Sequence, residues 1–221
     1  LAALPEAGAL RFRDEATGSE CNVPLAPTFA ADGAGSAIRS SLARSGHLGV
    51  REDRLDHDYK ELTIPARHAR HDTGRHEAAR HEMDPHGLHV WPRGGFMLIA
   101  LPNIDGSFTA TLFLSRSGAG SFDSLTSPER VQTLFQTQFS DAAQLMPNLL
   151  EEFAAHPQGQ LGTIYTRPWH VGGQVLLLGD AAHAIVPFHG QGMNAAFEDC
   201  LVLDGLLARH DTWEALFAEF E

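Results

Sequence analysis

The stretch VLLLGDAAHAIVPFHGQGMNAAFEDC, residues 175–200, limits the possible folds more than any other part of this sequence. Its opening apolar run predicts a fully buried strand, the kind found in parallel sheets. Gly179 allows a turn, so Asp180 follows at the carboxyl end of the strand, where open α/β sheets bind their ligands. A loop through Pro187 then leads to a helix that is predicted to begin near Gly192. The stretch therefore predicts one strand, turn and helix of an α/β sheet.

The residue types in this stretch suit a ligand that carries hydroxyl groups and negative charge. A carboxylate at position 180 suits hydroxyl groups, such as those of a ribose or a ribityl chain, better than it suits a phosphate. The N–H groups and the dipole at the start of the helix stabilise negative charge. On residue types alone, an ordinary helix after a glycine-rich turn is an equally good interpretation.

A dinucleotide fingerprint is a further interpretation of the same residues. The segment Gly190-Gln-Gly192-Met-Asn-Ala195 fits the pattern G-x-G-x-x-A. That fingerprint requires a strand that ends directly before its first glycine, whereas here the strand ends at Gly179. The segment is therefore not the first turn of a Rossmann fold.

Composition narrows the class of protein and its partners. Sixteen Lys and Arg against 28 Asp and Glu give a formal net charge of −12, which argues against nucleic acid or an anionic membrane as a partner. No apolar run approaches the roughly 18 residues of a membrane span. The two cysteines form no spaced framework, so we expect a soluble, cytoplasmic protein. The sequence predicts no particular oligomeric state.

A histidine-rich segment raises the question of a metal site. A zinc protease motif needs two histidines in the order HExxH, but after His76-Glu77 the next histidine stands at position 81. The interleaved arginines would also repel a cation. We therefore predict a solvated loop and no metal site in the segment that holds His68, His71, His76, His81, His86 and His89.

The rest of the chain predicts a mixed α/β (α+β) fold that contains an antiparallel sheet. Alternation puts Met97, Ile99 and Leu101 on one face of a meander of the strands LHVW, FMLIAL and SFTATLFL. Ser127 followed by Pro128 predicts the start of a helix. The other predicted elements are an N-terminal hairpin, a short helix in SAIRSSLAR, a strand at 59–66, helices at 128–139 and 142–155, a strand in LGTIYTRPW, and a last amphipathic helix with Ala196, Phe197, Cys200, Leu201, Leu203 and Leu207 on its apolar face.

Several stretches resemble the flavin-dependent aromatic hydroxylases. VLLLGDAAHAIVPFHGQGMNAAFEDC is similar to the second FAD motif of that family, and TFAADGAGSAIRSSL is similar to its Asp-Gly motif near the flavin and nicotinamide sites. YKELTIP, LHVWPRGGFMLIALPN and SFTATLFL resemble, in order, the substrate-domain strands of the kynurenine hydroxylases. The resemblance implies a partial FAD-binding domain at 1–50, a substrate-binding domain with its sheet and helices at 51–165, and a second part of the FAD-binding domain at 166–221.

The resemblance also implies which residues bind the cofactor. Asp180 would hold the ribityl or ribose hydroxyls of FAD. The amides of Gly192, Met193 and Asn194 would face the pyrimidine edge of the flavin, where charge accumulates on reduction. Asp32 would lie near the pyrophosphate or the cofactor groove.

The implied reaction is the hydroxylation of L-kynurenine to 3-hydroxykynurenine, in which NADPH reduces FAD and O₂ forms a flavin C4a-hydroperoxide. His189 and Gln191 would be the catalytic residues that orient the substrate carbonyl or the peroxide, while the protein supplies position and excludes water. The implied substrate-binding residues are Leu88, Met97, Ile99, Leu101 and Phe113 of the sheet, with Pro187, Phe188, His189 and Gly190 of the loop.

The sequence departs from the family pattern in one respect. The family begins with a βαβ unit that carries G-x-G-x-x-G and holds the adenosine pyrophosphate, and no such unit is found in these residues. We therefore expect an internal piece of the enzyme that is inactive alone and binds little FAD. Two other functions stay open: a flavin hydroxylase of another aromatic acid, such as a benzoate, and a non-catalytic module.

Overall fold

The structure of the chain, a computed structural model, describes residues 1–66 and 83–221. The chain forms two compact units: unit 1 comprises Leu1–Arg54 and Gly162–Glu221, and unit 2 comprises Leu55–Leu161. No helix in the described part of the chain combines the length and the apolar character that a bilayer crossing requires.

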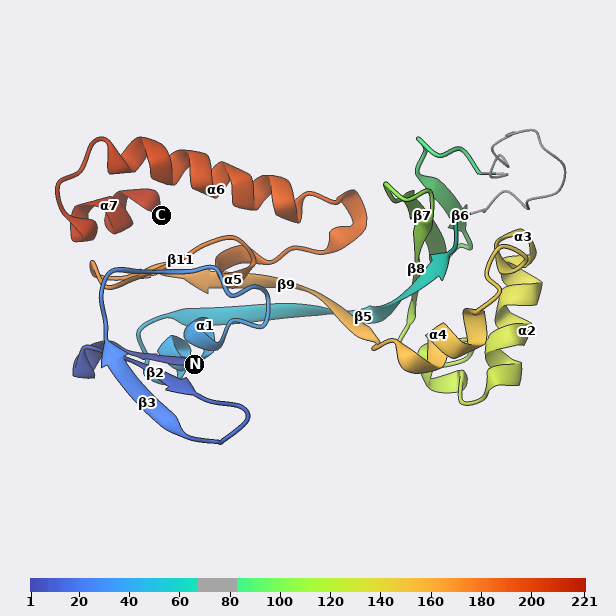
Figure 1. Cartoon of the computed structure of the whole chain (residues 1–221), viewed down its shortest axis with the longest axis horizontal. Coiled ribbons are helices and arrows are strands. Elements are labelled where there is room, and N and C mark those ends of the chain that lie inside the picture. Colours follow the sequence, from blue (N-terminus) through green and yellow to red (C-terminus); the bar gives the residue numbers. More distant parts are fainter. Residues whose placement is uncertain (67–82) are drawn as a thin grey trace, which may run out of the picture. The chain divides into compact units, whose positions relative to one another are not determined.

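Unit 1 has three layers around a small sheet with the strand order β10-β11-β4 (Figure 1). Its elements are β1 (Ala2–Leu4), η1 (Pro5–Ala7), β2 (Ala9–Arg13), β3 (Glu20–Pro24), β4 (Thr28–Ala30), α1 (Ala37–Arg44), β10 (His170–Val171), β11 (Val175–Leu177), α5 (Asp180–His183), η3 (Pro187–His189), α6 (Gly192–Leu207) and α7 (Trp213–Phe220). β11 is parallel to β4 and antiparallel to β10. Val175 and Leu177 pack in one core with α1, whereas Leu176 packs in another with α6 and α7. Because both faces of β11 are covered, its sequence is a continuous apolar run.

The predicted N-terminal hairpin is confirmed, with one strand more than expected. β2 and β3 pair antiparallel, and β1 joins the other side of β2. The carboxylate of Asp14 accepts hydrogen bonds from the backbone N–H groups of Ala16 and Thr17, at 2.8 and 3.0 Å, and so closes the turn between β2 and β3. The N–H of Ala3 donates to Ser41 Oγ at 3.0 Å, which ties β1 to α1.

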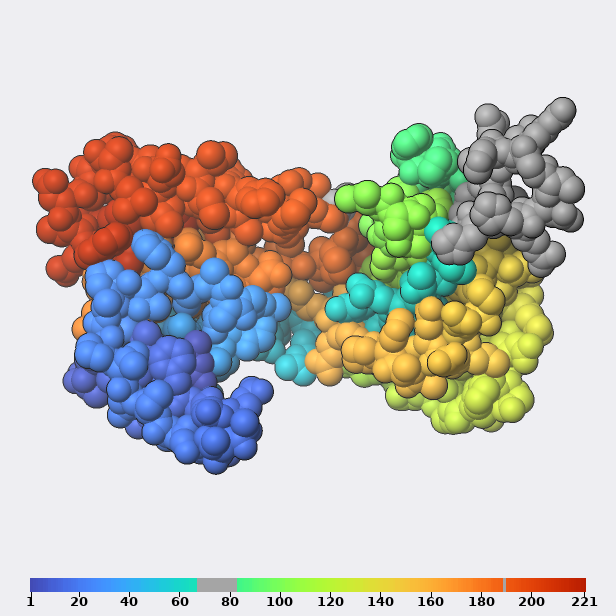
Figure 2. Space-filling view, viewed as in Figure 1, coloured from blue at the N-terminus to red at the C-terminus, as the bar shows by residue number. Residues whose placement is uncertain are grey.

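Helix α6 forms where the sequence predicts it, but the apolar residues of its outer side are exposed. Met193, Phe197 and Leu201 follow one another at intervals of four and are 65%, 60% and 75% exposed, whereas Leu206 is buried. Figure 2 shows α6, in red, as an outer surface of unit 1. The predicted apolar face is therefore only partly correct: Leu203 packs against the core, whereas Phe197, Leu201 and Leu207 are exposed.

Unit 2 contains most of a five-stranded sheet with the order β6-β7-β8-β5-β9. Its elements are β5 (Gly49–Ile64), β6 (His89–Pro92), β7 (Met97–Pro102), β8 (Phe108–Ser115), η2 (Phe122–Ser124), α2 (Pro128–Gln138), α3 (Ser140–Ala143), α4 (Leu149–Ala155) and β9 (Gly159–Arg167), and the first residues of β5 and the last of β9 belong to unit 1. The pairs β6–β7, β7–β8 and β5–β8 are antiparallel, which confirms the predicted meander. One face of this sheet packs against α2, α3 and α4 around Leu98, Leu112 and Phe135, each fully buried.

Two predicted elements have the wrong extent. β5 begins at Gly49 rather than at Tyr59. The charged residues before Tyr59 show no apolar alternation in the sequence, and they form a strand because they pair with a neighbouring strand of the sheet. The helix predicted at 142–155 is two short helices, α3 and α4, with Pro147 between them. Proline has no N–H to donate and disfavours helical backbone in the residue before it, so it ends the first helix.

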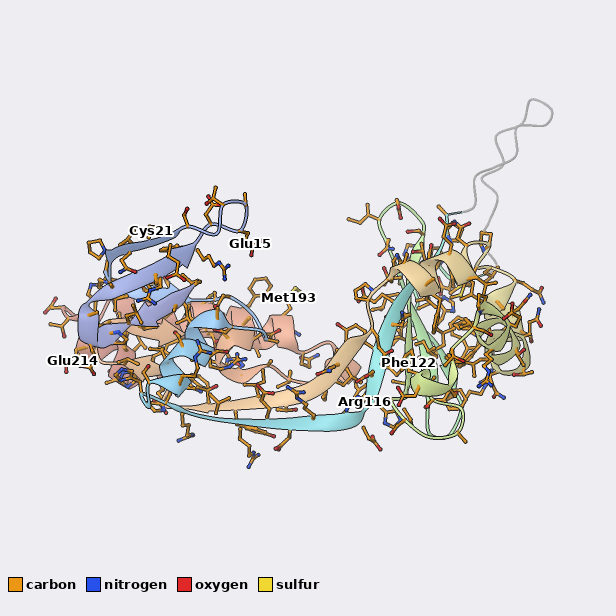
Figure 3. All side chains as sticks on the ribbon, turned by 90° about the horizontal axis from the view of Figure 1, so that it is seen from below. Glu15, Cys21, Arg116, Phe122, Met193 and Glu214 are labelled. Carbon is orange, nitrogen blue, oxygen red and sulfur yellow. The ribbon has the colours of Figure 1, made fainter. Side chains whose placement is uncertain are left out.

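An ion pair between a buried aspartate and a partly exposed arginine links β5 to the residue that follows β8 in unit 2. Asp58 on β5 is 2% exposed, and its carboxylate accepts hydrogen bonds from Arg116 Nη2 and Nε, at 2.9 and 3.1 Å, and from Gln158 Nε2 at 2.7 Å. Figure 3 labels Arg116 close to the β5 ribbon. Burial acts to raise the pKa of Asp58, but the hydrogen bonds from Arg116 and Gln158 outweigh it and lower the pKa below its usual value.

Candidate functional site

The turn after β11 has the conformation that the sequence predicts. Gly179 is buried and has φ 54° and ψ −137°, a region that residues with a side chain rarely adopt. A Cβ atom at this position would also lie 3.2 Å from the Cβ of Ala196 on α6. The glycine therefore permits both the turn and the close approach of α6, and Asp180 follows as the first residue of α5.

The structure brings Asp180 and the start of α6 together. Asp180 Oδ1 lies 3.6 Å from the position that a Cβ of Gly192 would occupy. The N–H of Ala195 bonds to the carbonyl of Gln191 within the first turn, so the N–H groups of residues 192–194 precede the regular helix bonds. The exposed carboxylate of Asp180 can accept hydrogen bonds from hydroxyl groups. The N–H groups of the helix N-terminus beside it can donate to an electron-rich group.

Asp32 accepts hydrogen bonds at the start of α1. Its carboxylate accepts hydrogen bonds from Ser36 Oγ at 2.6 Å and from the N–H of Ile38 at 3.2 Å. Ser36 Oγ in turn accepts from the N–H of Arg39 at 2.9 Å. Asp32 therefore caps the helix, and its predicted role near the cofactor groove stays a prediction.

Arg39 is a residue of this site that the sequence did not identify. Its side chain is 4% exposed, and its guanidinium donates to the carbonyl of Ala181 at 2.9 Å, to that of Asp180 at 3.5 Å and to that of Ala34. Among the described residues, no carboxylate hydrogen-bonds to this guanidinium. Burial lowers the pKa of Arg39, and the charges of Glu52 and Asp32 act in the opposite direction.

The position of Arg39 joins the two motif loops. Ala34 lies in the loop before α1, and Asp180 and Ala181 lie in the turn after β11. One side chain therefore holds together two segments that are 141 residues apart in the chain, counted from Arg39 to Asp180. The only sequence signal for it is an arginine between the buried Ile38 and Leu42 of a short amphipathic helix.

The sheet of unit 2 presents the predicted apolar residues on one face. Met97 pairs with Phe113, Ile99 with Thr111 and Leu101 with Thr109, so these residues point to the same side. Met97, Ile99 and Leu101 therefore share a face, as predicted. Phe113 is 3% exposed, Leu101 is 50% exposed, and Leu88, directly before β6, is 57% exposed. The opposite face packs on α2, α3 and α4.

The loop before α6 is a short 3-10 turn in unit 1. The N–H of Gly190 donates to the carbonyl of Pro187 at 3.0 Å, and Gly190 has φ 61°, the left-handed conformation. Phe188 is 40% exposed. Gln191 Oε1 accepts a hydrogen bond from Asn194 Nδ2 at 3.0 Å, so Gln191 contacts the first turn of the helix. The catalytic roles of His189 and Gln191, and a pocket that includes both this loop and the sheet face, stay predictions.

Part of the histidine-rich segment lies in unit 2. His68, His71, His76 and His81 lie outside the described residues. His89 Nε2 is 2.9 Å from the carbonyl of Asp84, and the backbone N–H of His86 donates to Asp84 Oδ1 at 2.9 Å. In residues 1–66 and 83–221, no three side chains of the metal-binding types form a cluster.

Comparison with known proteins gives one family match and a set of close relatives. The family described as FAD binding domain matches residues 7–215. The chain is 50% identical over 214 residues to a kynurenine 3-monooxygenase of Myxococcus xanthus (strain DK1622), which covers 97% of this chain and 44% of that protein. It is 44% identical over 216 residues to a kynurenine 3-monooxygenase of Xanthomonas axonopodis pv. citri (strain 306), which covers 98% of this chain and 46% of that protein. The chain thus spans less than half the length of these curated relatives.

Solved structures share the fold at low sequence identity. Klebsiella pneumoniae HpxO complexed with FAD and uric acid has a TM-score of 0.60 and 21% identity, over 97% of this chain and 50% of that chain. The tetrameric form of 2-methyl-3-hydroxypyridine-5-carboxylic acid oxygenase has a TM-score of 0.62 and 20% identity, over 100% of this chain and 53% of that chain. These likenesses confirm the predicted α/β fold class.

Proposed function

The chain belongs to the FAD binding domain family, and from this premise we propose that it is part of an FAD-dependent monooxygenase that hydroxylates L-kynurenine to 3-hydroxykynurenine with NADPH and O₂. The relatives at 44% and 50% identity are kynurenine 3-monooxygenases. The structural observation that carries the proposal is the carboxylate of Asp180 beside Gly192, at the end of a parallel strand and the start of α6. The proposal includes a cytoplasmic location, because Cys21 and Cys200 are both exposed and unpaired.

The cofactor contacts in this proposal come from unit 1. The carboxylate of Asp180 accepts hydrogen bonds from ribityl or ribose hydroxyls, and the N–H groups of Gly192, Met193 and Asn194 donate to the pyrimidine edge of the flavin. Asp32, which caps α1, lies near the pyrophosphate or the cofactor groove in this proposal. Bound FAD supplies electron transfer from NADPH to O₂, and the protein supplies binding and orientation.

The substrate contacts in this proposal come from the apolar sheet face and the 187–190 loop. Flat apolar walls hold an aromatic ring in one plane and exclude water, which brings its reacting carbon into position. His189 and Gln191 orient the substrate carbonyl or the reactive oxygen. The residues proposed for substrate binding are Leu88, Met97, Ile99, Leu101 and Phe113 of the sheet, and Pro187, Phe188, His189 and Gly190 of the loop.

A substrate screen of the full-length protein that contains this chain tests the proposal. L-Kynurenine is expected to stimulate NADPH oxidation with an equal yield of 3-hydroxykynurenine. If a benzoate is hydroxylated and L-kynurenine is not, the substrate assignment is wrong and the protein is a hydroxylase of another aromatic acid. A full-length protein without flavin absorbance after FAD is added would show a non-catalytic module instead.

Substitution of Asp180 tests the cofactor contact separately. Hydrogen bonds to a charged group contribute roughly 1.5–3 kcal/mol. Asp180→Ala should therefore weaken FAD binding by about tenfold to hundredfold, at 1.4 kcal/mol per decade. Asp180→Asn keeps an acceptor for hydroxyl groups and serves as the matched control, with a smaller loss. Equal FAD affinity in the wild type and the alanine variant would contradict this contact.

A further inference from the structure

The carboxylate of Asp199 on α6 lies against the turn that follows β11. Its side chain is 12% exposed. Asp199 Oδ2 accepts a hydrogen bond from the N–H of Gly179 at 2.7 Å and lies 2.8 Å from His183 Nε2. Gly179 precedes Asp180 in the chain and His183 follows it, so one oxygen atom of Asp199 contacts the turn on both sides of Asp180.

The bond to Gly179 has a clear physical role. Gly179 is buried and lies after the end of β11 and before α5, in a conformation that is neither strand nor helix. Its N–H therefore has no hydrogen-bond partner within a sheet ladder or a helix. A buried N–H without a partner is costly, and a carboxylate is a stronger acceptor than a neutral group. The other partner, His183, is held in place by Trp169, whose ring centroid is 4.9 Å from that of the imidazole.

The turn is held from the other side by α1. Arg39 binds the carbonyls of Asp180 and Ala181, whereas Asp199 binds the N–H of Gly179 and the imidazole of His183. The two charged side chains therefore fix both the donors and the acceptors of the turn. Of the two, Asp199 is on the helix whose first turn also belongs to the proposed flavin site.

We propose that Asp199 is a positioning residue of the flavin site, which sets the place of the Asp180 carboxylate relative to the first turn of α6. The inference rests on the proposed binding of FAD by Asp180 and by the N-terminus of α6. A flavin that contacts both groups requires a fixed distance between them, and Asp199 is the side chain that links the turn to the helix. Asp199 itself touches neither FAD nor substrate in this assignment.

Variants of Asp199 in the full-length protein test the inference by FAD affinity. Asp199→Ala removes the acceptor and should weaken FAD binding by about tenfold. Asp199→Asn keeps an oxygen that can accept from the N–H of Gly179, so it should recover most of the affinity. Asp204→Ala is the matched control: it removes the same charge from the same helix, and the side chain of Asp204 has no hydrogen bond or ion pair with any residue that the structure describes. This control should bind FAD like the wild type.

A double variant separates positioning from a general loss of stability. If Asp199 acts through Asp180, the variant with both residues changed to alanine should bind FAD no more weakly than Asp180→Ala alone. Additive losses, or full FAD affinity in Asp199→Ala, would overturn the inference. Full FAD affinity in Asp180→Ala would instead refute the proposed flavin contact, and the inference that rests on it would fall with it. Urea unfolding of each apoprotein shows whether the loss of affinity follows the loss of stability, and a loss fully explained in that way also overturns the inference.

Discussion

Substitution of Arg39 by methionine should destabilise unit 1 by about 2–4 kcal/mol. The guanidinium donates to the carbonyls of Ala181 and Ala34 and makes a long bond of 3.5 Å to that of Asp180. Hydrogen bonds of a charged group contribute roughly 1.5–3 kcal/mol each, which gives about 3–6 kcal/mol for the bonds to Ala181 and Ala34. Methionine keeps the packing of the aliphatic stem and removes the cost of burying a charge, which lowers the net loss.

Native-state hydrogen exchange of this chain, read separately for the two units, measures the effect. Amides of β4, β11 and α1 should lose protection by the stated free energy, and those of β7 and β8 should keep theirs. Arg39→Lys is the control, because it keeps the charge but cannot reach three carbonyls, so its loss should lie between the wild type and the methionine variant. A loss below about 0.5 kcal/mol in Arg39→Met, the size expected of an ordinary surface substitution, would refute the reasoning. Equal loss in both units would refute it too.

Three further predictions concern other parts of the chain. A Cβ on Gly173 would lie 2.8 Å from the backbone nitrogen of Glu214, which cannot move as a side chain can, so Gly173→Ala should cost about 1–3 kcal/mol in urea unfolding. The pKa of Asp58 is lower in the folded state than in the unfolded state, so its carboxylate stabilises the folded state. This stabilisation is fully present above the ordinary aspartate pKa of about 3.9 and is lost as the pH falls through the lower pKa of the folded state. The urea midpoint of unit 2 should therefore fall steeply below roughly pH 4, and less steeply in Asp58→Asn. His189→Ala in the full-length enzyme should retain FAD but release H₂O₂ from NADPH oxidation without matching product; loss of FAD with tight coupling would contradict its assigned role.

The sequence predicted those parts of the fold whose cause is local. The apolar run before Gly179, the glycine itself and the helix after the loop follow from residue type and spacing, and so do the strands around Met97. β5 was predicted too short, because its charged first half is a strand only through its partner. The break at Pro147 had a clear local signal, and the prediction of one continuous helix overlooked it.

The links that hold the candidate site together could not be predicted in the same way. Arg39 and Asp199 look like an ordinary arginine and an ordinary acid on two helices. Apart from the imidazole of His183, their partners are backbone groups, which lie in the turn around Asp180 and in the loop at Ala34. Nearly every residue has a backbone carbonyl and an N–H group, so the residue pattern does not show which of them a side chain binds. The sequence therefore does not indicate that either side chain contacts that turn. Only the three-dimensional arrangement of α1, α6 and the turn reveals them.

The parallel pairing of β4 with β11 determines the order in which the chain can fold during translation. Thr28 pairs with Val175, so β4 has to wait for the residues up to β11 to leave the ribosome before its partner exists. Unit 2 is continuous from Leu55 to Leu161 and can complete its own contacts within that interval. The segment that contains β4 meanwhile lacks this partner strand, and an unpaired strand edge is a hazard for association with other chains. The two motif loops therefore meet only after the inserted unit has been synthesised.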